Sequence, residues 1–99
     1  MEDDEEEGVK HLGTHINETL AESWHDSKGD FHRLNGPAIT FHDGDTRWYK
    51  HGFLHRLDGP ARIWPEQGIE HWYKDGDLYE PTAHEIIAWK MKKKQKKEF

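Results

Sequence analysis

The sequence predicts a mainly β domain, an antiparallel hairpin meander in a single-layer or curled sheet, followed by a C-terminal capping helix. Three observations lead to this fold class. Trp24, Trp48 and Trp72 are evenly spaced and stand in near-copies of one unit. Glycine turn dipeptides divide each copy into short β-prone runs, and a helix-capping sequence follows the last copy. Repeats of this length indicate stacked supersecondary units, each of which buries its apolar face against the next.

The first eight residues are predicted to form a disordered acidic leader. Residues 1–7 contain six acidic residues and no basic one. A block of like charges repels itself and has little apolar surface to bury, so it does not favour a folded segment.

Residues 9–23 allow two interpretations. Leu12, Ile16 and Leu20 have the i, i+4 spacing of a helix, whereas Gly13 weakens a helix at this position. The alternative is a further, degenerate strand that leads into the first tryptophan. The sequence leaves both interpretations open.

From the first tryptophan onward, turn residues recur at the short intervals that are typical of β-hairpins. Asp43-Gly44, His51-Gly52 and Asp75-Gly76 are turn dipeptides, because glycine adopts the positive φ that tight hairpin turns require. The runs between them are rich in β-forming residues and predict strands at residues 38–41, 47–50, 61–64 and 69–74.

A second type of connection occurs once in each repeat, at Asn35-Gly36-Pro37 and again at Asp58-Gly59-Pro60. The Asn or Asp side chain can bond the backbone two residues on, and proline fixes φ. The preceding His-Arg pair could be a functional row. A structural role is favoured, in which Arg56 pairs with Asp58 and the fold builds the same turn twice.

Alternation along the predicted strands places Trp48 and Trp72 opposite Tyr49 and Tyr73. Both faces of the sheet therefore carry bulky side chains, and neither face is purely apolar. This pattern suits a thin sheet better than a sandwich or a closed barrel. The repeat domain is expected to span residues 9–81, with a free sheet edge near residues 9–24 that could pair in a homodimer.

The repeat is followed by Thr82-Ala83-His84-Glu85, which has the spacing of a capping box. It predicts a helix from Ala83 to Lys97, within a C-terminal unit at residues 82–99. The helix is expected to cover the last strand. Its predicted apolar stripe, with Trp89 nearby, consists of Ala83, Ile86, Ile87 and Met91.

Composition limits the possible classes of protein. With 99 residues there is room for one domain, and the 32% hydrophobic and 34% charged residues lean toward disorder. Five Trp, three Tyr and four Phe argue for a folded, aromatic-rich domain. There is no Cys for disulfides, and no apolar run approaches the ~18–20 residues of a membrane span. A cytoplasmic location is expected, since the acidic N-terminus is unlike a signal peptide.

The pattern Trp-Tyr-Lys-x-Gly-x-x-His-Arg-x-Asp-Gly-Pro-Ala, carried by residues 24–80, resembles MORN-type repeats. It looks like a divergent form found in uncharacterised phage, giant-virus and bacterial proteins. The resemblance implies β-hairpin sheets that act as protein-interaction scaffolds, sometimes with lipid contacts. This chain has Arg33 and Arg56 where ordinary MORN repeats have glycine, and this departure argues against a lipid role.

The residues predict no catalytic or metal centre. The chain contains no nucleophile elbow, phosphate loop or serine–histidine array, so an enzyme is not expected. Nine histidines are present, but the pairs at i, i+4 spacing are interrupted by glycine or by a predicted turn. Metal ligation needs three or four convergent groups, so neither a metal nor a cofactor is predicted.

The preferred functional hypothesis is a protein-binding module, such as a small phage-type inhibitor or adaptor that docks on a host protein. Residues 8–89 carry a net charge of −5, which would steer the chain toward a basic partner and disfavours duplex nucleic acid. The alternatives are a small anionic-ligand (nucleotide) sponge, or a nucleic-acid or lipid binder that uses the lysines of residues 90–97. The candidate binding residues are Phe41, Tyr49, Trp64 and Tyr73, together with Arg33 and Arg56 as a row for an anion.

Overall fold

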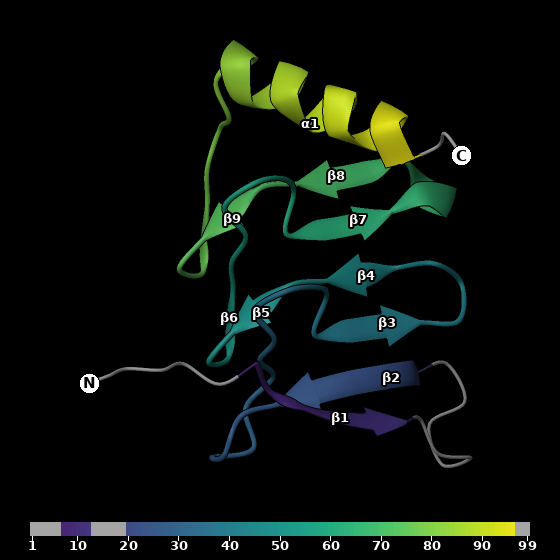
Figure 1. The fold of residues 1–99 in the computed structure, drawn as a ribbon, viewed down its shortest axis with the longest axis vertical. Coiled ribbons are helices and arrows are strands. Elements are labelled where there is room, and N and C mark those ends of the chain that lie inside the picture. Colours follow the sequence, from purple (N-terminus) through teal and green to yellow (C-terminus); the bar gives the residue numbers. More distant parts are fainter. Residues whose placement is uncertain (1–6, 13–19, 97–99) are drawn as a thin grey trace.

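The computed structural model describes residues 7–12 and 20–96 of the chain. A six-stranded antiparallel sheet has the order β1-β2-β3-β4-β7-β8, and two small hairpins and a C-terminal helix complete the fold (Figure 1). The sheet strands are β1 (Val9–Leu12), β2 (Leu20–His25), β3 (Ile39–Phe41), β4 (Thr46–Arg47), β7 (Arg62–Trp64) and β8 (Ile69–His71). The hairpins are β5 (Tyr49–Lys50) with β6 (Phe53–Leu54), and β9 (Tyr73–Lys74) with β10 (Asp77–Leu78). A 3-10 turn, η1 (Pro65–Gln67), precedes β8, and the helix is α1 (Ala83–Lys96). The mainly β prediction is confirmed.

The ambiguous N-terminal segment forms strands in its described parts. β1 pairs with β2 in the register Val9↔His25 to Leu12↔Glu22, and β2 runs through Trp24. The strand interpretation is therefore confirmed for residues 9–12 and 20–23, while residues 13–19 lie outside the described residues. β1 is an edge strand of the sheet, as expected. A homodimer through this edge remains a prediction.

The turn dipeptides form the expected turns. His51 and Gly52 have φ values of 47° and 87°, and Asp75 and Gly76 have values of 50° and 87°. Two successive positive φ angles are typical of the type I′ turn that matches the twist of a two-residue hairpin. Gly44 has a φ of 95° in the turn between β3 and β4.

The tryptophans break the strands that the sequence predicted as continuous. The amide of Trp48 bonds Ala61 O in the main sheet at 2.7 Å, whereas its carbonyl accepts the amide of His55 at 3.0 Å. Residues 47–50 are thereby divided into β4 and β5, and residues 69–74 into β8 and β9. The prediction of one continuous strand in each place is wrong, because the tryptophan turns its two backbone groups toward different neighbours.

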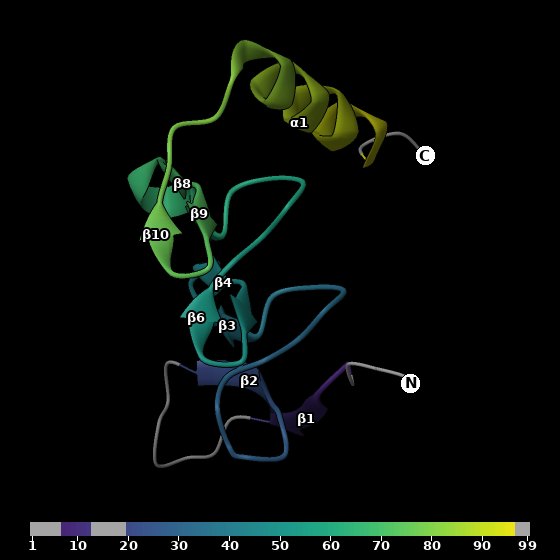
Figure 2. The same ribbon diagram turned by 90° about the vertical axis from the view of Figure 1, so that its left-hand side faces the viewer.

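The hairpins therefore form two separate two-stranded sheets beside one end of the six-stranded sheet (Figure 1). The connections at residues 32–38 and 55–61 project from one side and lie one above the other, with α1 beyond the second (Figure 2). We call these connections loop 1 and loop 2. The copy at residues 48–71 thus contributes a small hairpin, a loop and two sheet strands, whereas the preceding copy has a single bridge, His25↔Phe31, in place of the hairpin.

The described interior is small and mixed in polarity. Its buried apolar residues are Ala38, Ile39, Ala61, Trp72 and Trp89, and its buried polar residues are Ser23, Asp26, His32, Asp45 and Arg56. Buried polar groups are tolerated when they are hydrogen-bonded. The stack therefore depends on specific polar pairs as well as on apolar contact.

The capping box at the start of α1 is confirmed. The Thr82 hydroxyl accepts the amide of Glu85 at 3.2 Å, and the Glu85 carboxylate accepts the amide of Thr82 at 2.9 Å. Tyr79, which replaces the motif histidine in the last copy, donates its hydroxyl to the same carboxylate at 2.9 Å. The last copy of the repeat is therefore hydrogen-bonded, through Tyr79, to the capping residue Glu85 of the helix.

The packing face of α1 differs from the predicted stripe. Trp89 is buried, whereas Ile87 and Met91 are 57% and 58% exposed. Lys93 pairs with Glu70 of β8 at 3.0 Å, and Lys92 pairs with Asp58 of loop 2. α1 therefore lies over the end of the stack through Trp89 and two lysines. It is not a membrane span, as no helix in the described part of the chain is long and apolar enough to cross a bilayer.

Candidate functional site

The two loops hold their arginines in the same way. Arg56 donates to Asp58 at 2.9 Å and to the carbonyl of Pro60 at 3.2 Å, and its guanidinium lies 3.8 Å from the Trp48 ring centroid. Arg33 donates to the carbonyl of Pro37 at 3.4 Å and lies 4.0 Å from the Trp24 ring centroid. The predicted Arg56–Asp58 pair is confirmed. Burial lowers the pKa of Arg56, against the opposing effect of Asp58.

The carboxylate partners of Arg33 come from outside its own loop, and one of them is Glu22 of β2, whose Oε2 lies 3.7 Å from Arg33 Nη1. Loop 1 has Asn35 where loop 2 has Asp58. Glu7 accepts from Arg33 Nε at 3.1 Å, and its other oxygen accepts from the amide and the side chain of Asn35 at 3.2 Å and 3.1 Å. Glu7 thus supplies the carboxylate that Asn35 lacks. Residues 1–6 of the predicted leader lie outside the described residues.

A half-open cleft of about 430 Å³ lies between loop 1 and loop 2. Its charged or titratable lining groups include Arg33, Lys50, His55 and Arg56, and Asp58 is the acidic one. Trp48 provides aromatic surface in the same cleft. The structure therefore brings the two predicted arginines to one cavity, although Arg56 is only 7% exposed.

The histidines of the repeated motif connect each loop to the hairpin of the following repeat. His32 Nδ1 accepts the backbone amide of His51 at 3.0 Å, and His55 Nδ1 accepts that of Asp75 at 3.0 Å. The acceptor role requires the proton on Nε2 in each neutral ring. The repeated histidine is therefore a structural link between neighbouring units.

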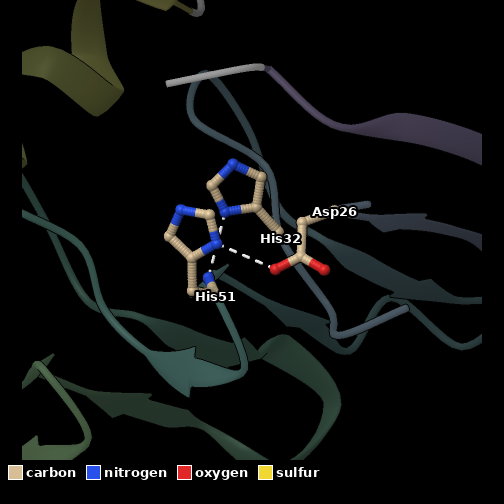
Figure 3. Close-up of side chains that lie close together, drawn as sticks. All are labelled: Asp26, His32 and His51. Carbon is tan, nitrogen blue, oxygen red and sulfur yellow. Dashed lines mark hydrogen bonds and ion pairs between the residues drawn. The ribbon is translucent and has the colours of Figure 1, made fainter. Parts of the chain in front are cut away.

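Among the described residues, one cluster consists of side chains that can bind a metal: Asp26, His32 and His51 (Figure 3). Their possible ligand atoms lie within 4.8 Å of one another. His51 Nδ1 lies 2.8 Å from Asp26 Oδ2, and the rings of His32 and His51 stack at 4.1 Å with an interplanar angle of 25°. Imidazole lone pairs lie in the ring plane, so two stacked rings do not aim them at one point. The arrangement fits a hydrogen-bonded clamp between turns better than a tetrahedral metal centre.

The clamp has an electrostatic consequence. The hydrogen bond with His51 lowers the pKa of Asp26 to about 2, helped by the amides of Asp30 and Lys28 and opposed by burial. Asp26 is not part of the repeated pattern, since the equivalent residue of the next copy is Lys50. The sequence contained no signal for this group.

The four predicted aromatic residues do not share one surface. Phe41 and Trp64 belong to the main sheet, where Arg47 lies 4.9 Å from the Phe41 ring centroid and Arg62 lies 5.3 Å from that of Trp64. Tyr49 and Tyr73 instead begin the two small hairpins. All four are partly buried, and their role in binding stays a prediction.

The most exposed apolar side chains of the hairpins were not among the predicted residues. Phe53 on β6 is 60% exposed and Leu78 on β10 is 66% exposed. Phe53 lies against the following hairpin, because a Cβ added to Gly76 would come within 3.0 Å of its ring. We call residues 49–54 and 73–78 the hairpin wall. Phe53 and Leu78 are not equivalent positions, since Phe53 corresponds to Asp77 and Leu78 to the partly buried Leu54, so the repeat pattern did not single out this pair.

Comparison with known proteins supplied no further assignment. No protein-family model matches the chain, and neither curated proteins nor solved structures gave a match.

Proposed function

We propose that this chain is a non-enzymatic protein-binding module, an inhibitor or adaptor, that docks on a basic protein surface through the hairpin wall. The observation that carries the proposal is the exposure of Phe53 and Leu78 on neighbouring hairpins. Large exposed apolar side chains that are rimmed by polar groups mark interaction sites. The partly buried Tyr49 and Tyr73 supply the aromatic type that is enriched at interfaces.

Charge selects the kind of partner. Asp75 and Asp77 are exposed on the second hairpin, and Asp30 is exposed beside Gly52 of the first. Lys50 and Lys74 offset two of these three acidic charges, and residues 8–89 as a whole carry a net charge of −5. A basic patch on the partner complements this rim and speeds encounter. The stacked hairpins also agree with the MORN-type resemblance and the scaffold role that it implies.

The test compares two double variants of the full chain. Phe53→Ser with Leu78→Ser removes the apolar residues of the hairpin wall. Ile87→Ser with Met91→Ser is the matched control, since these side chains are similarly exposed on α1. A partner captured from lysate of the source organism is purified and titrated against each variant by isothermal titration calorimetry.

We expect the hairpin variant to lose at least about tenfold in affinity, as for interface hot spots, and the helix variant to bind like the wild type. The affinity should fall with added salt, because exposed charges are screened. Loss in the helix variant alone, or a partner with an acidic contact surface, would overturn the proposal.

A further inference from the structure

We infer that the cleft between loop 1 and loop 2 is a binding site for a small aromatic anion, a flat ring that carries a phosphate or carboxylate group. This inference is independent of the hairpin wall. It rests on a comparison of two equivalent spaces in the same chain, of which the space between the loops is the larger.

The equivalence follows from the repeat. The open cleft is lined in part by Leu34, Asn35 and Trp48. The corresponding residues of the next copy, Leu57, Asp58 and Trp72, line a space between loop 2 and α1. That second space measures only about 160 Å³, compared with about 430 Å³ for the cleft.

Trp89 accounts for part of the difference. Its indole centroid lies 4.7 Å from the Arg56 guanidinium. A Cβ added to Gly59 would come within 2.8 Å of the same ring. An aromatic ring therefore packs on the arginine and glycine of loop 2. At the corresponding glycine of loop 1, Gly36, the three atoms nearest to an added Cβ all belong to the guanidinium of Arg33, and no ring is among them.

The lining of the open cleft favours a negative ligand. Arg33 and Lys50 contribute cationic side chains, of which Arg33 also pairs with Glu7 and Glu22. The acidic lining residue, Asp58, already pairs with Arg56 and Lys92. Arginine stacks on flat rings and also binds carboxylate or phosphate oxygens, so one side chain serves both parts of such a ligand.

The size of the cleft agrees with a small molecule. Ligand pockets commonly enclose about 300–1,000 Å³ and combine apolar or aromatic walls with a few polar groups. The cleft has this composition, with Leu34 and Trp48 beside the basic residues. It is half open, which suits a ring that inserts between the loops with its charged group near the rim.

The test is calorimetric titration of the full chain with four probes. AMP and indole-3-acetate each combine a ring with an anionic group, one as a phosphate and one as a carboxylate. Adenosine supplies a ring without charge, and inorganic phosphate supplies charge without a ring. We expect at least one aromatic anion to bind with a Kd below about 1 mM, and at least about tenfold more tightly than adenosine and phosphate.

A pair of variants locates the site. Lys50→Gln removes a cation of the cleft, whereas Lys74→Gln changes the equivalent lysine of the next copy, which does not line it. We expect Lys50→Gln to weaken binding about tenfold and Lys74→Gln to change it less than about twofold. Failure of both aromatic anions to bind, equal binding of phosphate alone, or equal effects of the two variants would overturn the inference.

Discussion

Arg33 and Arg56 occupy equivalent loops, yet their carboxylate partners come from different parts of the chain. Asp58 lies two residues after Arg56, whereas Glu7 lies 26 residues before Arg33. The substitution of Asn35 for aspartate thus couples loop 1 to the segment that precedes β1. Where the two copies differ, at Asn35 and Asp58, loop 1 makes a contact with Glu7 that is distant in sequence.

This coupling predicts the effect of changing Glu7. Glu7→Gln should lower the free energy of unfolding by at most about 1 kcal/mol, because the side chains of Glu7 and Arg33 are 36% and 22% exposed and solvent screens the pair. Asn35→Asp in the same background should recover part of the loss, since loop 1 would then contain its own carboxylate. Urea denaturation measures both changes, and an absence of recovery would contradict the equivalence of the two loops.

At the scale of elements, α1 is held by the loop below it. Trp89 contacts Arg56 and Gly59, while Lys92 and Lys93 pair with acids of loop 2 and β8. Helical spacing indicated an apolar stripe that included Ile87 and Met91, and this prediction was wrong. A short helix of this composition gains most from burying its largest ring, and the adjacent stripe then faces solvent.

Trp89→Ala should therefore destabilise the chain strongly. Replacing a buried Trp by Ala typically costs about 3–5 kcal/mol, a large part of the stability of a small domain. Ile87→Ala is the control and should change the unfolding free energy by less than about 0.5 kcal/mol, because Ile87 is exposed. Chemical denaturation followed by circular dichroism measures both. Similar losses in the two variants would show that α1 packs through another face.

At the scale of the whole molecule, the stack is held by ionised groups as well as by apolar contact. The pKa values of Asp26, Asp45, Asp58 and Glu85 are all lowered in the folded state. At Asp45 and Asp58, burial alone would raise the pKa. Hydrogen bonds from Arg47 and Arg62 at Asp45, and from Lys92 and Arg56 at Asp58, outweigh it.

Acid should therefore weaken the fold in a defined range. The carboxylate of Asp26 stays ionised down to a pH of about 2 in the folded chain, whereas its usual pKa is 3.8. Below 3.8 the unfolded chain binds more protons, so stability contributed by Asp26 is lost as the pH falls toward 2. The urea midpoint should fall across this range, and Asp26→Asn should make the fall smaller. NMR titration of a His51→Ala variant should show the pKa of Asp26 moving back toward 3.8.

Local patterns accounted for much of the fold. The positive φ at His51-Gly52 and Asp75-Gly76, the capping box at Thr82 and the Arg56–Asp58 pair depend on residues close in sequence. They could be predicted because turn and cap energetics are local. The candidate site was less accessible to prediction. The sequence indicated Arg33 and Arg56 as candidate binding residues, and both line one cleft. The shape of that cleft could not be predicted, because it depends on how the two loops stack.

The sequence by itself determined the repeat, its hairpin turns and the start of the helix, since each is encoded in spacing and in backbone preference. Only the tertiary structure decided where the tryptophans divert the chain out of the main sheet, that Glu7 completes loop 1, and that Trp89 packs on Arg56 and Gly59 of loop 2. These features depend on contacts between distant segments and on competition for limited buried area, which no local pattern records. The larger of the two spaces, the cleft between loop 1 and loop 2, is where we expect a ligand to bind.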